Sequence, residues 1–185
     1  MRKDFGPKTW LYPMPVFIVA AYGIDGTPNA MTAAWGGIYT DDKVGICLSE
    51  GHMTTKNILA TKAFTVSMAT VQHTTACDYI GIVSGNNASD KLARAGFHTT
   101  KSQHVNAPLI DELPMAMECE LVSYDEESNF LVGRIVNVCA DDSILTDGKI
   151  DVAKLRPITY DPVSHSYMTI GEKAGNAFSD GKKLK

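Results

Sequence analysis

Three β-type segments lie close together near the start of the chain, and they restrict the fold more than any other feature of the sequence. Residues 15–22, 30–39 and 43–49 are rich in β-branched, aromatic and small apolar residues. Short connections separate them, and residues 23–29 are dense in turn formers. Because a parallel crossover needs a dozen or more residues, this spacing predicts antiparallel hairpins rather than βαβ units.

The rest of the chain predicts further strands and a few helices. We expect a helix that Thr54 or Thr55 caps, a strand over 63–69, a helix over 74–83, a short helix over 90–95 capped by Ser89, a long connection over 97–113, strands over 115–124 and 130–140, a turn at Asp147-Gly148, a short helix or extended piece over 152–155, and a hairpin of 158–160 with 166–170. Apolar residues occupy both faces of 130–138, which predicts burial on both sides, in a barrel wall or a dimer interface. The fold class is therefore mainly β, a small antiparallel barrel with helices at its rim.

Length and composition exclude several classes of protein. The 185 residues are 44% hydrophobic and 21% charged, as in a globular protein rather than a disordered chain, a collagen or a coiled coil. We expect one domain over residues 1–185, with a tail frayed from about residue 179. The net charge of −4 lacks the excess of basic residues that is typical of nucleic-acid-binding proteins. The apolar stretch 14–21 is too short for a membrane span, and a cytoplasmic location is expected.

Cysteine and histidine spacings give no support for a metal site. The four cysteines form no C-x-x-C pair, and the five histidines form no H-x-x-x-H pair. Cys47, Cys119 and Cys139 lie in apolar strand-like runs, so we expect buried thiols. Nucleotide-binding glycine motifs and a serine nucleophile motif are also absent from the sequence.

One polar segment has the composition of a phosphate site. Residues 49–57, Ser-Glu-Gly-His-Met-Thr-Thr-Lys-Asn, join a predicted strand to a predicted helix. They offer hydroxyls, the unpaired N–H groups of a first helical turn and one cation, Lys56. The alternative is a threonine N-cap followed by a surface lysine.

A second segment suits a flat ring. Residues 29–35, Asn-Ala-Met-Thr-Ala-Ala-Trp, alternate small residues with one amide and one hydroxyl. Small side chains let a ring approach the backbone closely, where N–H and C=O groups meet its polar edge. The alternative is an ordinary strand whose small residues pack under a helix.

With these residues the sequence resembles a known family. The motifs that look like those of the flavin reductase-like family are residues 29–35, Thr54-Thr55-Lys56-Asn57-Ile58 before Ala63-Phe64, Gly81-Ile82-Val83-Ser84-Gly85 with Asp90-Lys91, and the ending 167–178. The resemblance runs from about residue 13 to residue 178, and within the family the chain resembles the flavoredoxins.

The resemblance implies an FMN-binding split β-barrel of Greek-key antiparallel topology, usually a homodimer with FMN near the subunit interface. Carried over by position, the cofactor-binding residues are Asn29, Ala30, Met31, Thr32 and Ala33 along the isoalloxazine, Ser49, His52, Met53, Thr54, Thr55 and Lys56 at the ribityl phosphate, and Ser84 and Lys91 completing the site. Asn86 and Asn87 stand where many members have a basic residue. The roles of Tyr160 and Tyr167 stay open.

The function that this resemblance implies is an FMN-dependent oxidoreductase that takes electrons from NAD(P)H or a redox protein. The chemistry belongs to the flavin, so no catalytic side chain is expected. Two alternatives remain at this point: an FMN electron carrier without its own NAD(P)H activity, and a non-catalytic flavin-binding module.

Overall fold

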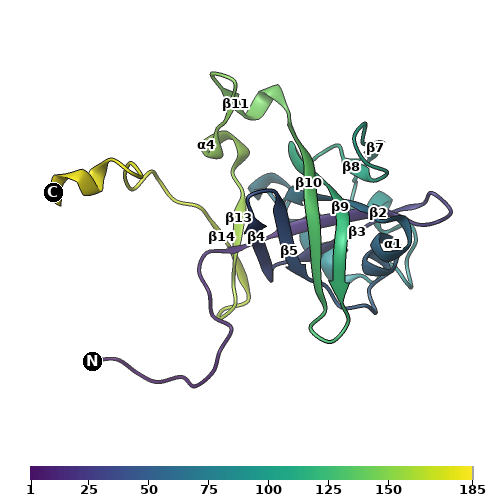
Figure 1. Ribbon diagram of the computed structural model, residues 1–185, viewed down its shortest axis with the longest axis horizontal. Helices are drawn as coiled ribbons and strands as arrows, with labels where there is room; N and C mark the ends of the chain where they lie inside the picture. The colour runs from purple at the N-terminus through teal and green to yellow at the C-terminus, as the bar shows by residue number, and fades with distance from the viewer. Residues whose placement is uncertain (185) are drawn as a thin grey trace.

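The main sheet contains seven antiparallel strands in a computed structural model that describes residues 1–184 (Figure 1). The strands, in sheet order, are β3 (Pro28–Ala33), β2 (Phe17–Tyr22), β6 (Ala63–Met68), β9 (Met115–Asp125), β10 (Phe130–Ala140), β5 (Lys43–Cys47) and β4 (Gly36–Thr40). The predicted antiparallel barrel architecture is confirmed.

A two-residue connection forces this sheet to curl. β3 and β4 follow each other in sequence, separated only by Ala34 and Trp35, yet they occupy opposite edges of the sheet. Seven strands laid flat would put these edges about 29 Å apart, whereas three Cα steps span at most about 11 Å. The sheet therefore bends until its edges face each other, as in a half-barrel. The Cys47 N–H donates to the Trp35 carbonyl (2.8 Å) at this seam.

Short helices and three small sheets surround the main sheet. The helices are α1 (Met53–Thr61), α2 (Thr74–Ile82), α3 (Lys91–Arg94) and α4 (Val152–Leu155), with 3₁₀ turns at Val71–His73, Asp142–Ile144 and Asp180–Leu184. In the first small sheet β13 (Ile158–Asp161) lies between β1 (Met14–Pro15) and β14 (Ser166–Thr169). The other two are hairpins of β7 (Thr99–Lys101) with β8 (Pro108–Ile110) and of β11 (Leu145–Thr146) with β12 (Lys149–Ile150).

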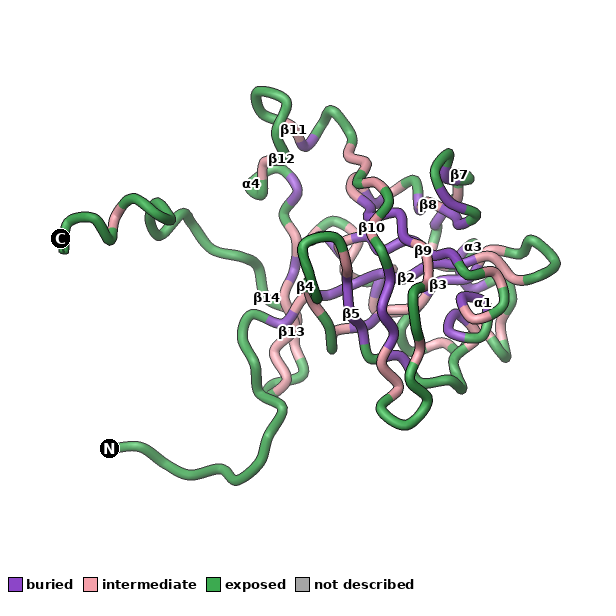
Figure 2. Tube along the Cα trace, in the orientation of Figure 1, coloured by how far each residue is buried: buried purple, intermediate pink, exposed green. Residues whose placement is uncertain are grey.

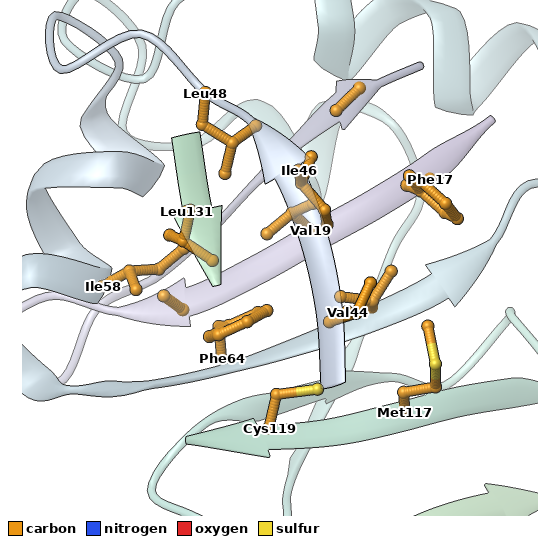
Figure 3. Close-up of a cluster of buried hydrophobic side chains, with 13 residues drawn as sticks. Phe17, Val19, Val44, Ile46, Leu48, Ile58, Phe64, Met117, Cys119 and Leu131 are labelled. Carbon is orange, nitrogen blue, oxygen red and sulfur yellow. The ribbon is translucent and has the colours of Figure 1, made fainter. Parts of the chain in front are cut away.

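Strand β2 is buried along both faces, which explains its continuous apolar sequence (Figure 2). On one face Phe17 and Val19 join the cluster inside the curl, with Phe64 and Leu131 (Figure 3). On the other face Ile18 packs with residues of α2 and α3. The sheet thus lies between two apolar clusters, and α2 is held against its outer face.

Several boundary predictions were wrong for local reasons. The expected strand 30–39 is two strands, because the chain leaves one edge at Ala34 and enters the other at Gly36. Neither Thr54 nor Thr55 caps α1, whose N-cap is His52 without a side-chain cap bond. The expected connection 97–113 contains the β7–β8 hairpin.

Two further corrections concern α3 and the thiols. Ser89 is not the cap of α3, which begins at Lys91 after Asp90. Cys47 is exposed and Cys139 is half-buried, so of the three thiols expected to be buried only Cys119 is. In β10 burial on both faces holds near Leu131 and Val132 but fails further along, where Val136 and Val138 are more than 40% exposed.

The expected strand 15–22 is divided at Val16, because Met14–Pro15 pairs with β13 in a small sheet and Phe17–Tyr22 belongs to the main sheet. The other strand and helix predictions are confirmed, including the last hairpin, β13–β14, and the turn at Asp147-Gly148, where both residues have positive φ. Within residues 1–184, no helix is long and apolar enough to cross a membrane.

Candidate functional site

Two adjoining cavities lie where β3, α1 and α2 meet. The larger has a volume of about 320 Å³ and a mostly apolar wall. The smaller has a volume of about 180 Å³ and ends at polar groups. Met31, His52, Gly81 and Ile82 line both, so the two form one elongated hollow.

Aromatic rings form one wall of the apolar cavity. Trp35 comes from the β3–β4 connection, Tyr160 from β13 and Tyr167 from β14. The ring centroids of Trp35 and Tyr160 lie 6.2 Å apart, as do those of Tyr160 and Tyr167. The Tyr167 hydroxyl donates to Asp78 Oδ1 (2.8 Å), and burial together with this carboxylate raises the pKa of the phenol. This wall is suited to a flat ring.

Strand β3 supplies the facing wall. Met31, Thr32, Ala33 and Ala34 line the apolar cavity, and Thr32 Oγ1 donates to the Cys77 carbonyl (2.5 Å), which holds the strand against α2. Small side chains here leave backbone groups open to a ligand.

Asn29 and Lys91 define the polar cavity. Asn29 is buried and its Oδ1 accepts from Thr54 Oγ1 (2.8 Å). Lys91 is 2% exposed, and its Nζ donates to the carbonyls of Ile80 (3.0 Å) and Val83 (2.9 Å). An ammonium has three donors, so within the described part of the chain one N–H is left for a ligand. Desolvation lowers the pKa of Lys91 to about 8.

The loop after α2 holds a second cation, Lys56 of α1, at the rim of the polar cavity. Lys56 Nζ donates to Asn86 Oδ1 (3.2 Å), and Asn86 Nδ2 donates to the Gly51 carbonyl (3.1 Å) and Ser84 Oγ (3.1 Å). These bonds tie the N-terminus of α1 to the loop at Ser84. His52, the N-cap, has its pKa lowered by desolvation and by Lys91, so it stays neutral near pH 7.

The shape and polar groups of the hollow suit a flat ring that ends in an anion. A Cβ at Gly85 would lie 2.3 Å from Asn29 Nδ2, and one at Gly81 would lie 2.9 Å from Thr32 Cβ. Glycine at both positions therefore keeps the hollow open. Thr55 Oγ1, in the first turn of α1, is buried without a hydrogen-bond partner among residues 1–184. Lys91 in the wall and Lys56 at the rim are the cations near this helix N-terminus, where anions bind.

Comparison with known proteins agrees with this geometry. The family model described as "Flavin reductase like domain" matches residues 10–160, most of the chain. The chain belongs to the flavin reductase-like family.

Among solved structures of this flavin reductase-like fold, two flavoredoxins are similar over almost their full length. Flavoredoxin of Desulfovibrio vulgaris (Miyazaki F) is 38% identical with a TM-score of 0.93, covering 98% of this chain and 100% of that one. Flavoredoxin from Methanosarcina acetivorans is 27% identical with a TM-score of 0.91, and both chains are covered completely. Nitrilotriacetate monooxygenase component B from Bacillus cereus, at 19% identity and a TM-score of 0.78 over 95% and 99% of the chains, shares the fold.

The structure gathers most of the residues that the resemblance assigned to the cofactor. Those that line the hollow are Asn29, Met31, Thr32, Ala33, His52, Met53, Thr54, Ser84 and Lys91. Ala30 does not line it, because its side chain is buried in the cluster under α2. Ser49, Thr55 and Lys56 lie beside the hollow rather than in its wall.

Some lining residues of this flavin reductase-like chain were not assigned from its sequence. Trp35 and Gly81 stand within the quoted motifs, so their positions already contained a signal. No sequence signal pointed to Asp78, because it lies in α2 outside the quoted motifs. Tyr160 and Tyr167, left open by the motifs, are brought to the wall by pairing of β1 with β13 and of β13 with β14.

Proposed function

We propose that this protein binds FMN in the two adjoining cavities and is an oxidoreductase that takes electrons from NAD(P)H or a protein donor. The observation that carries the proposal is the joining of an aromatic cavity to a polar one that ends at Lys91 and the N-terminus of α1. A flavin ring with a phosphate tail has this order of apolar and anionic parts. FMN supplies the redox chemistry when bound.

At the ring end, the chain's own residues bind and exclude water. Trp35, Tyr160 and Tyr167 offer apolar faces, while the backbone of β3 offers N–H and C=O groups to the ring edge. The Tyr167–Asp78 bond keeps the third ring in place.

At the phosphate end, Lys91 and Lys56 neutralise charge. Lys91 is held by two carbonyls and directs its remaining donor to the ligand, whereas Lys56 is positioned at the rim by Asn86. The first turn of α1 adds N–H groups and the positive end of its dipole.

A second candidate is an FMN electron carrier without NAD(P)H activity. The 38% identity to a flavoredoxin over nearly the whole chain favours it. Trp35, 46% exposed at the cavity mouth, would place the cofactor near the surface for exchange with a redox protein.

The first experiment tests the cofactor. Purified protein titrated with FMN is expected to quench flavin fluorescence with a stoichiometry of one per chain. A protein that neither carries nor takes up FMN contradicts both candidate functions.

Anaerobic titration of the FMN-loaded protein separates the candidates. Rapid bleaching with NADH or NADPH supports the reductase, and bleaching only with a reduced redox protein supports the carrier. Binding of FMN without reduction by either would leave a flavin-binding module and contradict both. NAD(P)H as donor fits the proposed cytoplasmic location. We also propose a homodimer, as is usual in the family.

A further inference from the structure

Asp78 is the one acidic residue among the described residues that line the two adjoining cavities. The cations of the site, Lys91 and Lys56, lie in and beside the polar cavity, whereas Asp78 lines the apolar one. The hollow is therefore polarised along its length, with positive charge at one end and a carboxylate at the other. The positive end suits a phosphate, and the carboxylate needs a partner of its own.

Contacts with three elements hold Asp78 in place. It stands one helical turn before Gly81 in α2, so the same face of the helix brings both residues to the apolar cavity. The carbonyl of the preceding residue, Cys77, accepts a hydrogen bond from Thr32 of β3 (2.5 Å). The Asp78 Oδ1 atom accepts one from the Tyr167 hydroxyl of β14 (2.8 Å). The carboxylate is therefore preorganised beside the backbone of β3.

The second oxygen of this carboxylate, Oδ2, has no hydrogen-bond or salt-bridge partner within residues 1–184. A carboxylate accepts several hydrogen bonds, and leaving it beside an apolar cavity without a donor is costly. The cavity wall supplies no cation, because desolvation and Lys91 lower the pKa of His52 and keep it neutral. The donor that Oδ2 lacks must therefore come from water in the empty cavity and from the ligand in the filled one.

The groups around the apolar cavity specify the edge of the ring that it receives. Trp35, Tyr160 and Tyr167 favour a flat ring, the backbone of β3 offers N–H donors, and Asp78 adds a charged acceptor. An edge on which one N–H lies between two carbonyls satisfies these groups together. The isoalloxazine ring has such an imide edge at N3, and N3–H is the only donor on the oxidised ring.

We propose that Asp78 is the specificity-determining residue of the apolar cavity and accepts a hydrogen bond from the imide N–H of the bound ring. Tyr167 is then a positioning residue, because its hydroxyl occupies one carboxylate oxygen and leaves the other for the ring. A flat ring without this N–H leaves the carboxylate unpaired and is rejected. The inference rests on the proposed flavin function and adds the ring edge that the cavity recognises.

Riboflavin and 3-methylriboflavin test this contact, because they differ only at N3 and neither carries a phosphate. For the unaltered protein, fluorescence titration is expected to give a dissociation constant about 10- to 100-fold higher for 3-methylriboflavin, the range for a hydrogen bond to a charged group. Asp78→Ala removes the acceptor and makes room for the methyl group. Riboflavin should then bind about tenfold more weakly, and the two dissociation constants should lie within about twofold of each other.

Asp78→Asn tests the same contact with the side-chain volume kept. The amide oxygen can still accept from Tyr167, which turns the amide NH₂ group toward the ring and sets a donor against a donor. Riboflavin binding should weaken at least as much as in Asp78→Ala. Circular dichroism of both variants should show the native fold.

The matched control is Asp41→Asn in the turn between β4 and β5. Asp41 is exposed and lines neither cavity, and its replacement changes the net charge of the chain by the same amount. The preference for riboflavin over 3-methylriboflavin should be unchanged in this variant.

A purely structural role for Asp78 gives a different result. If its bond to Tyr167 only tied α2 to β14, Asp78→Ala would weaken the binding of both ligands by the same factor and keep their ratio. That outcome overturns the inference, as does equal affinity of the unaltered protein for riboflavin and 3-methylriboflavin. Both outcomes leave the proposed function standing, whereas a protein that takes up no flavin overturns the function and the inference together.

Discussion

The polar cavity and the apolar cavity adjoin each other but are built from different kinds of contact. The polar cavity is assembled by hydrogen bonds between buried groups, as in Thr54 to Asn29 and Lys91 to the end of α2. The apolar cavity is walled by rings from β13, β14 and the β3–β4 connection, which meet through packing. A flavin without a phosphate therefore distinguishes the two: riboflavin should report the apolar cavity alone, and FMN both.

Lys56→Ala should have the largest effect on this difference. Loss of a charge-assisted bond to phosphate is expected to weaken FMN binding by about 1.5–3 kcal/mol. Riboflavin binding should change little, which fluorescence titration of both ligands would measure. Equal losses for FMN and riboflavin would place Lys56 away from the phosphate.

Gly85→Ala should disturb the polar cavity through its geometry rather than its charge. The new Cβ, 2.3 Å from Asn29 Nδ2, would push the amide off Thr54 and weaken FMN binding by about 1–3 kcal/mol. Gly171→Ala, whose Cβ meets nothing within 4 Å, is the control. Unchanged FMN affinity in Gly85→Ala would show that the loop at Gly85 moves to accommodate the new methyl group without weakening the site.

Alkaline pH should weaken FMN binding through Lys91. With its pKa lowered to about 8 by burial, Lys91 is cationic below that pH and loses its charge above it. A phosphate binds the cationic form, whose fraction falls from about one half at pH 8 to about one tenth at pH 9, so the FMN dissociation constant should rise about fivefold over this range. Riboflavin and the Lys91→Met variant should show no such slope; a slope shared by riboflavin would assign the titration to another group.

Trp35→Ala should lower the affinity for both ligands equally. The ring packs against Tyr160, and removing one member of such a pair costs about 1 kcal/mol. Equal shifts in the two fluorescence titrations are expected. A loss of affinity for FMN alone would contradict the assignment of Trp35 to the apolar cavity.

Tyr167→Phe should have the smallest effect. It removes the bond to Asp78, and the free energy of unfolding in urea is expected to fall by about 0.5–1.5 kcal/mol while both flavin affinities change less than twofold. Tyr160→Phe, whose hydroxyl meets the exposed His165, is the control and should cost less stability.

Local patterns in the sequence predicted most elements of the fold and marked two segments, residues 29–35 and 49–57, that meet at the hollow. Strands such as β6 and β9 follow from alternation and β propensity, and the threonine-lysine segment indicated the α1 terminus before the structure placed Asn29 and Lys91 beside it. These signals are local, because each residue type acts on its own neighbours.

Long-range pairing accounts for what the sequence did not predict. The sequence predicts one strand over residues 30–39, because no residue there has a propensity that would show where the chain passes from β3 to β4 at Ala34. Asp78 and Tyr167 are 89 positions apart and meet only after β14 pairs with β13. Cys47, predicted to be buried from its apolar strand, is exposed because it ends that strand at the cavity mouth.

The seam between β3 and β4 also makes the Cys47 amide a natural probe of the site. Its hydrogen bond to the Trp35 carbonyl bridges the two-residue connection, and both residues line the apolar cavity. Solvent deuterium reaches that amide only when the seam opens, and a ligand that bound only the closed form would slow exchange in proportion to its occupancy. One backbone proton therefore links the closure of the barrel to the filling of its cavity.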